Sequence, residues 1–349
     1  MKTVTIPGVS FPVSQICLGT AFFNNPKYVS KETSFELMDY YFRRGGRFFN
    51  TAHEYGRGLS ELGLGEWIRT RGVRKQIVVT SKGGEDTTRK PACAMHREEL
   101  LEDIDESLER LGLEELDFYL LHQDDPTVSV EEIVGTMEEI KKAGKIRHYG
   151  CSNWSPERQR EARAFAKKQG YQGFVMDEIE HSIARVNQVN EQRNIKWLDD
   201  TFEELRKEDG MCVGAYSAVA RGVFKKYLKN GNFEHSGGYT SDDGWHRHYT
   251  NPYNLEVAAR LKKLSEETGH SVVALQLAWI ADYPRNYPCF SIISASKVSQ
   301  LEESLAANDI TLTPDMISYL CPDRKQFPDG LDLMRAGQVF PFGLESTES

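Results

Sequence analysis

The sequence predicts an α/β protein built as a closed (β/α)8 barrel, the TIM-barrel architecture. Short apolar runs alternate with amphipathic segments of helical length along the 349 residues, and eight such pairs can be distinguished. Strands that alternate with helices in this way pair in parallel, because each crossover helix returns the chain to the same end of the sheet. No Gly-x-Gly-x-x-Gly follows any of the apolar runs. Eight units at this length therefore favour a closed barrel over an open doubly wound sheet.

The expected elements follow one another regularly. A β-hairpin over 3–14, turning at Pro7-Gly8, is expected to cover the closed end of the barrel. The strands are expected at 15–20, 47–52, 76–82, 116–121, 146–152, 174–180, 211–217 and 289–295. The helices are expected at 30–44, 60–71, 97–112, 130–143, 156–169, 195–208, 254–268, 271–282, 298–307 and 313–320, the last ones being extra C-terminal helices. We expect a single domain over 1–349, with a tail from about 321 whose composition does not favour regular structure.

Local signals support these boundaries. Ser30 can cap the helix that follows it, and Gly45-Gly46 can end it. In the segment 97–112, leucine and isoleucine recur at helical spacing and form one apolar stripe. The segment 223–252 is rich in glycine, histidine, tyrosine and aspartate, and we expect it to be a long polar loop.

Composition and charge limit the function. A formal net charge of −9 argues against nucleic-acid or anionic-membrane partners. The sequence contains no run of about 18 apolar residues, so we expect no membrane span. The N-terminal residues lack the apolar region of a signal peptide. Six cysteines lack Cys-x-x-Cys spacing, and Cys17, Cys151, Cys212 and Cys289 fall within expected strands. We therefore expect buried, reduced cysteines, a cytoplasmic location and a small-molecule substrate.

Three successive strand ends carry residues suited to acid–base chemistry. Tyr55 follows the strand that ends at Asn50, Lys82 ends the next strand, and His122 follows the one after it. In a parallel barrel these ends lie at the same face, where active sites are found. A proton donor, a cation that acidifies it and an imidazole that orients a carbonyl can converge there.

These residues stand in motifs that resemble the aldo-keto reductase superfamily over about residues 3–320. The matching segments, in the family's order, are Asn50-Thr51-Ala52-His53-Glu54-Tyr55-Gly56, Thr80-Ser81-Lys82, Leu121-His122, Gly144-Lys145-Ile146-Arg147 with Gly150-Cys151-Ser152-Asn153-Trp154, and Ala215 through Gly222. The resemblance implies a barrel that binds NAD or NADP and reduces an aldehyde, ketone or sugar carbonyl to an alcohol, or catalyses the reverse reaction.

The resemblance also implies roles for individual residues. Tyr55 would exchange a proton with the carbonyl oxygen, assisted by Lys82 and His122, with Asn50 at the family's aspartate position. Cofactor contacts are implied for Thr20, Ser152, Asn153, Glu178, Tyr216, Ser217, Ala218, Val219, Arg221, Ser294, Ala295, Ser296, Lys297, Gln300, Glu303 and Ser304. No metal is expected.

Several positions depart from the family's pattern. Asn50 replaces an aspartate, so we expect Lys82 to lack one stabilising anion and to have a lower pKa than it would have beside an aspartate, unless another carboxylate, such as Glu178, takes over the pairing. Glu178 replaces a glutamine, and an ionised glutamate can accept but not donate a hydrogen bond to a nicotinamide amide. Ser296 stands where the family often places a cation for the 2′-phosphate, which favours NAD, whereas Lys297 beside it leaves NADP open.

Two other classes of function remain open from the sequence. Asn50 and Glu178 are compatible with a nicotinamide-binding regulatory protein whose catalysis is vestigial. Carboxylates such as Glu178 and Glu180 are compatible with a redox epimerase or isomerase acting on a sugar-like substrate, or with a hydrolase. The aromatic residues of the loop 223–252 could stack on a sugar; they are Tyr239, Trp245, His246, His248 and Tyr249, followed by Tyr253. The oligomeric state is not indicated.

Overall fold

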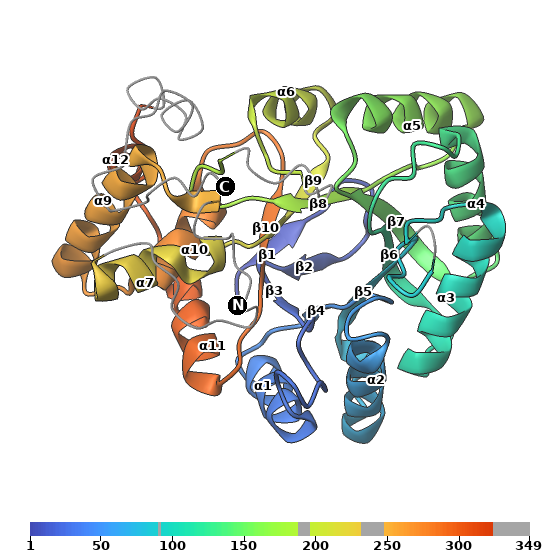
Figure 1. The fold of residues 1–349 in the computed structure, drawn as a ribbon, viewed down its shortest axis with the longest axis horizontal. Helices are drawn as coiled ribbons and strands as arrows, with labels where there is room; N and C mark the ends of the chain where they lie inside the picture. The colour runs from blue at the N-terminus through green and yellow to red at the C-terminus, as the bar shows by residue number, and fades with distance from the viewer. Residues whose placement is uncertain (90–91, 188–195, 232–247, 324–349) are drawn as a thin grey trace, which may run out of the picture. The chain divides into compact units, whose positions relative to one another are not determined.

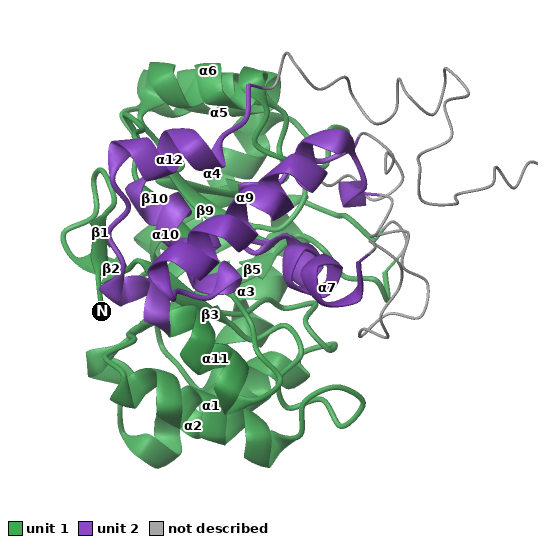
Figure 2. Cartoon of the chain, turned by 90° about the vertical axis from the view of Figure 1, so that its left-hand side faces the viewer, with its two compact units in different colours: residues 1–180, 196–216, 284–305 green, residues 181–195, 217–283, 306–349 purple. Residues whose placement is uncertain are grey.

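The computed structural model describes residues 1–89, 92–187, 196–231 and 248–323. The chain divides into two compact units, shown in different colours in Figure 2. Unit 1 comprises residues 1–180, 196–216 and 284–305, and unit 2 comprises residues 181–195, 217–283 and 306–349. The expectation of a single domain stays a prediction.

Unit 1 contains a closed parallel barrel, which confirms the predicted fold class (Figure 1). Its strands are β3 (Ile16–Gly19), β4 (Phe48–Asn50), β5 (Val78–Gly83), β6 (Leu116–Leu121), β7 (Ile146–Ser152), β8 (Met176–Glu180), β9 (Cys212–Tyr216) and β10 (Cys289–Ile293). They pair in sequence order, and β10 closes the barrel against β3. The register places Asn50 beside Thr80 and Ser152 beside Glu178, so the carboxyl ends of the strands form one rim.

Helices connect the strands of unit 1. They are α1 (Lys31–Arg43), α2 (Leu59–Arg71), α3 (Arg97–Leu111), α4 (Val130–Lys142), α5 (Pro156–Gln169), α6 (Asp200–Asp209) and α11 (Val298–Leu305), with a 3-10 turn η1 at Arg74–Gln76. The side chains of Ser30, Ser129 and Ser155 each accept a backbone hydrogen bond at the start of their helix, which satisfies an otherwise unpaired N–H group. None of the helices in the described ranges is long and apolar enough to cross a membrane.

The N-terminal hairpin covers the amino end of the barrel, as predicted. It consists of β1 (Thr3–Thr5) and β2 (Pro12–Ser14), paired antiparallel with Val4 opposite Val13. These valines belong to a buried cluster with Cys17, Phe48 and Phe290 of the barrel strands. The four cysteines expected within strands are all buried and free, as predicted.

Several expected boundaries in unit 1 are wrong by two or more residues, and hydrogen bonds explain two of them. The helix predicted from 195 begins only at Asp200, because the backbone of Lys196 to Leu198 runs parallel to the end of β8. Glu180 donates its N–H to the Lys196 carbonyl at 3.1 Å, and the N–H of Leu198 donates to the Glu180 carbonyl at 2.9 Å. The strand predicted from 76 begins at Val78, since Gln76 closes the turn η1. In both places a hydrogen bond, to β8 in the first case and within η1 in the second, outweighs the local sequence pattern from which the element was predicted.

In unit 2, the described elements are mainly helical. They are η3 (Ala220–Gly222), α7 (Val223–Asn230), α9 (Pro252–Thr268), α10 (Val272–Asp282), η4 (Ala306–Asp309) and α12 (Pro314–Leu320). The expected loop from 223 is therefore wrong at its start, where Val223 and Phe224 are buried and fix one face of α7. Tyr239, Trp245 and His246 lie outside the described residues. His248, Tyr249 and Tyr253 are buried, so their rings do not form an exposed stacking surface.

Two helical glycines give a matched test of this packing. A Cβ on Gly65 of α2 would lie 2.5 Å from the Leu111 carbonyl oxygen and 2.7 Å from its Cα, whereas a Cβ on Gly135 of α4 would have nothing within 4 Å. Alanine in a helix stabilises by about 0.5–1 kcal/mol relative to glycine, and overpacking costs about 1–3 kcal/mol. We expect Gly65→Ala to lower the free energy of unfolding by about 1 kcal/mol or more and Gly135→Ala to raise it, both measured by urea denaturation. Equal effects of the two substitutions would show that α2 does not pack this closely on the end of α3.

Candidate active site

The three predicted chemical residues come together at the carboxyl ends of β4, β5 and β6. The Lys82 Nζ atom donates a hydrogen bond to the Tyr55 hydroxyl at 3.3 Å and lies 4.8 Å from the centre of the tyrosine ring. The rings of Tyr55 and His122 meet edge to face, with centroids 5.5 Å apart. The ammonium group and the imidazole therefore flank the same phenol.

Lys82 is buried, with 2% of its surface exposed, and it is paired with a carboxylate. Its Nζ lies 3.3 Å from Glu178 Oε2, and it also donates to Asn50 Oδ1 at 2.6 Å and to the Thr51 carbonyl at 3.0 Å. Asn50 Nδ2 in turn donates to Glu178 Oε1 at 2.5 Å. The expectation that Lys82 lacks a stabilising anion is therefore wrong, because Glu178 reaches it from β8.

The orientation of the Asn50 amide follows from its two neighbours. Its oxygen faces the ammonium group of Lys82, and its NH₂ group faces the carboxylate of Glu178. The reverse orientation would place donor against donor and acceptor against acceptor. Asn50 thus bridges the two charges and, together with them, is almost completely buried.

Electrostatics keep Lys82 charged in spite of its burial. Burial is the largest influence and lowers the pKa of Lys82, since it disfavours the charged form. The charges of Glu178 and Tyr55 and the hydrogen bonds to both raise this pKa, and the net shift is upward. The ammonium form therefore persists at neutral pH.

His122 is held by its backbone and faces a carboxylate that the sequence analysis did not identify. Its N–H donates to the Gly83 carbonyl at 2.9 Å, and its carbonyl accepts from Asn153 Nδ2 at 3.2 Å. Its Nδ1 lies 3.0 Å from Glu85 Oε2 but forms no hydrogen bond with it, so the contact is electrostatic. The only sequence signal for Glu85 is its position just after Gly83-Gly84 at the end of β5.

The pKa of Glu85 is lowered. Burial is the largest influence and raises it, but the interaction with His122 and the charge of Lys82 together outweigh burial. Glu85 is therefore a carboxylate at neutral pH, beside the imidazole.

A second group of predicted residues gathers around Asn153, which has a left-handed backbone with φ 61°. Asn153 Oδ1 accepts hydrogen bonds from the Tyr216 hydroxyl at 2.7 Å and from the Lys196 N–H at 3.2 Å. Ser152 Oγ accepts from Asn153 Nδ2 at 3.0 Å and donates to the Glu178 carbonyl at 2.7 Å. The structure thus links the ends of β7, β8 and β9 through one asparagine.

The residues predicted for the pyrophosphate lie in unit 2, in a turn with unusual backbone angles. Ser217, Ala220 and Arg221 have φ angles of 52°, 46° and 53°. Left-handed conformations of non-glycine residues are costly and cluster at ligand sites. The N–H groups of Ala220 and Gly222 turn back onto the carbonyls of Ser217 and Val219, while Ala218 is buried.

The residues predicted for the adenosine half lie between β10 and α11. Gln300 Oε1 accepts from both the N–H and the hydroxyl of Ser296, at 2.9 and 3.0 Å, and Ser304 donates to the Gln300 carbonyl at 3.0 Å. Lys297 is exposed and has no ion-pair partner among the described residues. Ser294, Ala295 and Glu303 fall in the same segment, and Thr20 is buried near β4, where its hydroxyl donates to the Asn50 carbonyl at 3.1 Å.

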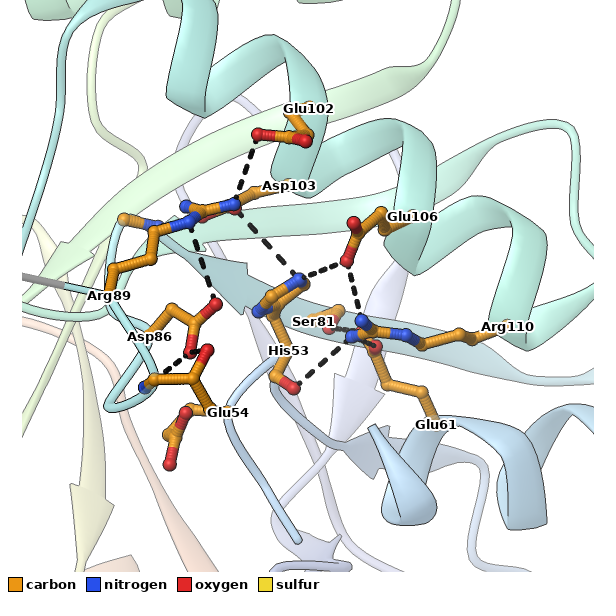
Figure 3. A network of polar contacts seen from close by, with 12 residues as sticks. His53, Glu54, Glu61, Ser81, Asp86, Arg89, Glu102, Asp103, Glu106 and Arg110 are labelled. Atoms are coloured by element: carbon orange, nitrogen blue, oxygen red, sulfur yellow. Dashed lines mark hydrogen bonds and ion pairs between the residues drawn. The ribbon is translucent and has the colours of Figure 1, made fainter. Parts of the chain in front are cut away.

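The residues directly before Tyr55 are held by the polar network in Figure 3. His53 Nε2 lies 2.8 Å from Glu106 Oε2 of α3, and Arg110 bonds the same oxygen at 2.5 Å. The Glu54 carboxylate accepts from the N–H and the hydroxyl of Thr87, at 3.0 and 2.6 Å. Since these residues precede Tyr55 directly, the network restrains the position of the phenol.

Comparisons with known proteins identify the family to which the chain is similar. The model of the Aldo/keto reductase family matches residues 15–321. The chain is 27% identical over 351 residues to "Aryl-alcohol dehydrogenase [NADP(+)]" of Phanerodontia chrysosporium, covering 92% of this chain and 86% of that protein. It is 26% identical over 344 residues to "Norsolorinic acid reductase stcV" of Emericella nidulans, covering 95% of this chain and 83% of that protein.

A solved structure has a fold similar to that of this chain. The thermostable aldo-keto reductase Tm1743, in complex with the inhibitor epalrestat, superposes with a TM-score of 0.68 at 23% sequence identity. The match covers 92% of this chain and 98% of that one. Because the family model spans most of the sequence, the chain belongs to the aldo/keto reductase family and is an oxidoreductase.

Proposed function

We propose that this enzyme reduces the carbonyl group of a small molecule to an alcohol, or oxidises the alcohol, with a nicotinamide cofactor. The contact between Tyr55 and Lys82, 3.3 Å long and flanked by His122, carries this proposal. Such a cofactor, when bound, supplies or accepts the hydride at the carbonyl carbon. Within unit 1, the Ser152–Asn153 pair at the carboxyl end of β7 suits the amide-bearing ring of such a cofactor.

The residues of the chain handle the proton. Tyr55 donates its hydroxyl proton to the substrate oxygen in reduction and takes it back in oxidation. The neighbouring ammonium group of Lys82 stabilises the phenolate that remains, and Glu178 keeps that lysine charged. The Nδ1 atom of His122 faces Glu85, which leaves Nε2 as the ring nitrogen to contact the same substrate oxygen.

The relatives guide the choice of substrate and cofactor. One relative is named for aryl alcohols and for NADP(+), so an aryl aldehyde with NADPH is the first pair to test. We propose NADP, contrary to the expectation of NAD from the sequence, because Lys297 is exposed without an ion-pair partner among the described residues. The pairing of Glu178 with Lys82 weakens the argument for vestigial catalysis, since no charge is missing from the site.

Replacement of Tyr55 tests the proton donor. We expect Tyr55→Phe to lower kcat for an aryl aldehyde by roughly 10²–10⁴-fold, the usual contribution of general acid catalysis, while cofactor binding measured by fluorescence titration changes little. Tyr40→Phe is the matched control, because the Tyr40 hydroxyl accepts a hydrogen bond from Arg44 at 3.2 Å on exposed α1. A Tyr55→Phe enzyme with nearly normal kcat would refute the assignment.

Exchange of the charged and neutral partners of Lys82 tests the role of Glu178. Glu178→Gln removes the largest influence that raises the pKa of Lys82, so burial should prevail and the basic limb of the pH–rate profile should move to lower pH. Asn50→Asp adds a second carboxylate and should move this limb to higher pH. The double variant carries one carboxylate again, and its basic limb should return close to that of the wild type.

The same three variants also report on stability. Removing one partner of a buried ion pair typically costs about 3–5 kcal/mol, and the double variant should regain much of that loss. A basic limb that does not respond to Glu178→Gln would mean that the ionisation of Lys82 does not control the rate.

Dissociation constants test the cofactor. We expect NADP⁺ to bind more tightly than NAD⁺ at the same salt concentration. Lys297→Ala should weaken the binding of NADP⁺ roughly ten-fold and leave the binding of NAD⁺ unchanged, since a charged hydrogen bond contributes about 1.5–3 kcal/mol. Lys167→Ala, on exposed α5, removes the same charge elsewhere and is the control. Equal or tighter binding of NAD⁺ by the wild type would favour the original expectation from the sequence.

A further inference from the structure

Glu85 places a negative charge beside the site of the proposed reaction. Its carboxylate lies 3.0 Å from His122 Nδ1, and the side chains of Glu85 and His122 are 24% and 14% exposed. His122 in turn meets the ring of Tyr55 edge to face. One imidazole ring therefore separates this carboxylate from the face that His122 presents to the substrate oxygen.

The ion-pair contact of Glu85 is with the imidazole of His122 and not with a lysine or an arginine. No lysine or arginine among the described residues forms an ion pair with it, and the positive charge of Lys82 is already paired with Glu178. The backbone at Glu85 is held by an antiparallel bridge to Cys93, so its position does not depend on His122 alone. Partial exposure leaves the carboxylate able to act on a charged group nearby.

We propose that Glu85 selects substrates by charge: the enzyme accepts uncharged or cationic carbonyl compounds and discriminates against those with an anionic group near the carbonyl. This proposal rests on the proposed function, because it assumes that the carbonyl binds between Tyr55 and His122. For an anionic substrate group about 8 Å from the Glu85 carboxylate, at an effective dielectric constant of about 20, the repulsion lowers affinity about thirty-fold. Screening by salt reduces this, so roughly ten-fold discrimination is expected.

Three aldehydes of similar shape provide the test. 4-Formylbenzoate is an anion at pH 7, its methyl ester is neutral, and (4-formylphenyl)trimethylammonium is a cation. We would measure kcat/KM for each with NADPH, and compare the ratio of anion to neutral ester between wild type and variants. Glu85→Gln should raise this ratio roughly ten-fold and lower the ratio of cation to neutral ester, whereas Glu85→Asp, which keeps the charge, should leave both ratios near those of the wild type.

The matched control is Glu114→Gln. Glu114 is exposed and lies before β6, whereas His122 follows this strand. The length of the strand, about 20 Å for six residues, therefore separates the two. Its removal changes the net charge by the same amount without changing the charge beside His122. We expect both ratios to stay unchanged in this variant.

The outcomes distinguish the two proposals. If Glu85→Gln lowers kcat/KM equally for all three aldehydes, Glu85 only supports His122 and the selection by charge is refuted. If Glu85→Gln and Glu114→Gln change the ratios equally, the effect belongs to the overall charge and the proposal also fails. A wild type that reduces none of the three aldehydes would overturn the proposed function and, with it, this inference.

Discussion

The site depends on how a buried ammonium group is balanced. Lys82 is 2% exposed, and a charge removed from water to that extent costs several kcal/mol unless an opposite charge accompanies it. Glu178 supplies that charge from β8, at 3.3 Å, and Asn50 joins the two through hydrogen bonds to both. The resemblance places an aspartate at position 50 and a glutamine at position 178. The chain therefore carries the same single negative charge, but on another strand.

This arrangement separates two tasks that one aspartate would combine. Glu178 neutralises Lys82, whereas Asn50 contributes only hydrogen bonds and stays neutral. In the proposed reaction Tyr55 releases its proton 3.3 Å from an ammonium group whose other charge partner is already in place. The polar environment is therefore set before the reaction, which is how preorganised sites stabilise developing charge. The network at His53 and Glu54 contributes by holding the phenol against this centre.

The barrel and the positions of Tyr55, Lys82 and His122 could be predicted, because strand period and strand ends are local properties of the sequence. The pairing of Lys82 with Glu178 could be named only as an alternative, since it joins β5 to β8, which are not neighbours in the barrel, and depends on side-chain length and rotamer. The extended segment before α6 was missed for a similar reason: its hydrogen bonds go to Glu180, and nothing within 196–199 indicates them. In α7, the buried Val223 and Phe224 stand in a lysine-rich stretch that resembles a loop.

Glu85 and Glu178 show why carboxylates at one rim need not serve one purpose. Glu178 is buried, bonded through both oxygens and matched by the charge of Lys82, so its field is largely confined to that pair. Glu85 is partly exposed and lies against an imidazole, and no lysine or arginine of the described residues neutralises it. A charge without a fixed counter-ion extends its influence to whatever binds next to it. In the two proposals, Glu178 therefore acts inward on the proton donor and Glu85 outward on the substrate, and burial is what distinguishes them.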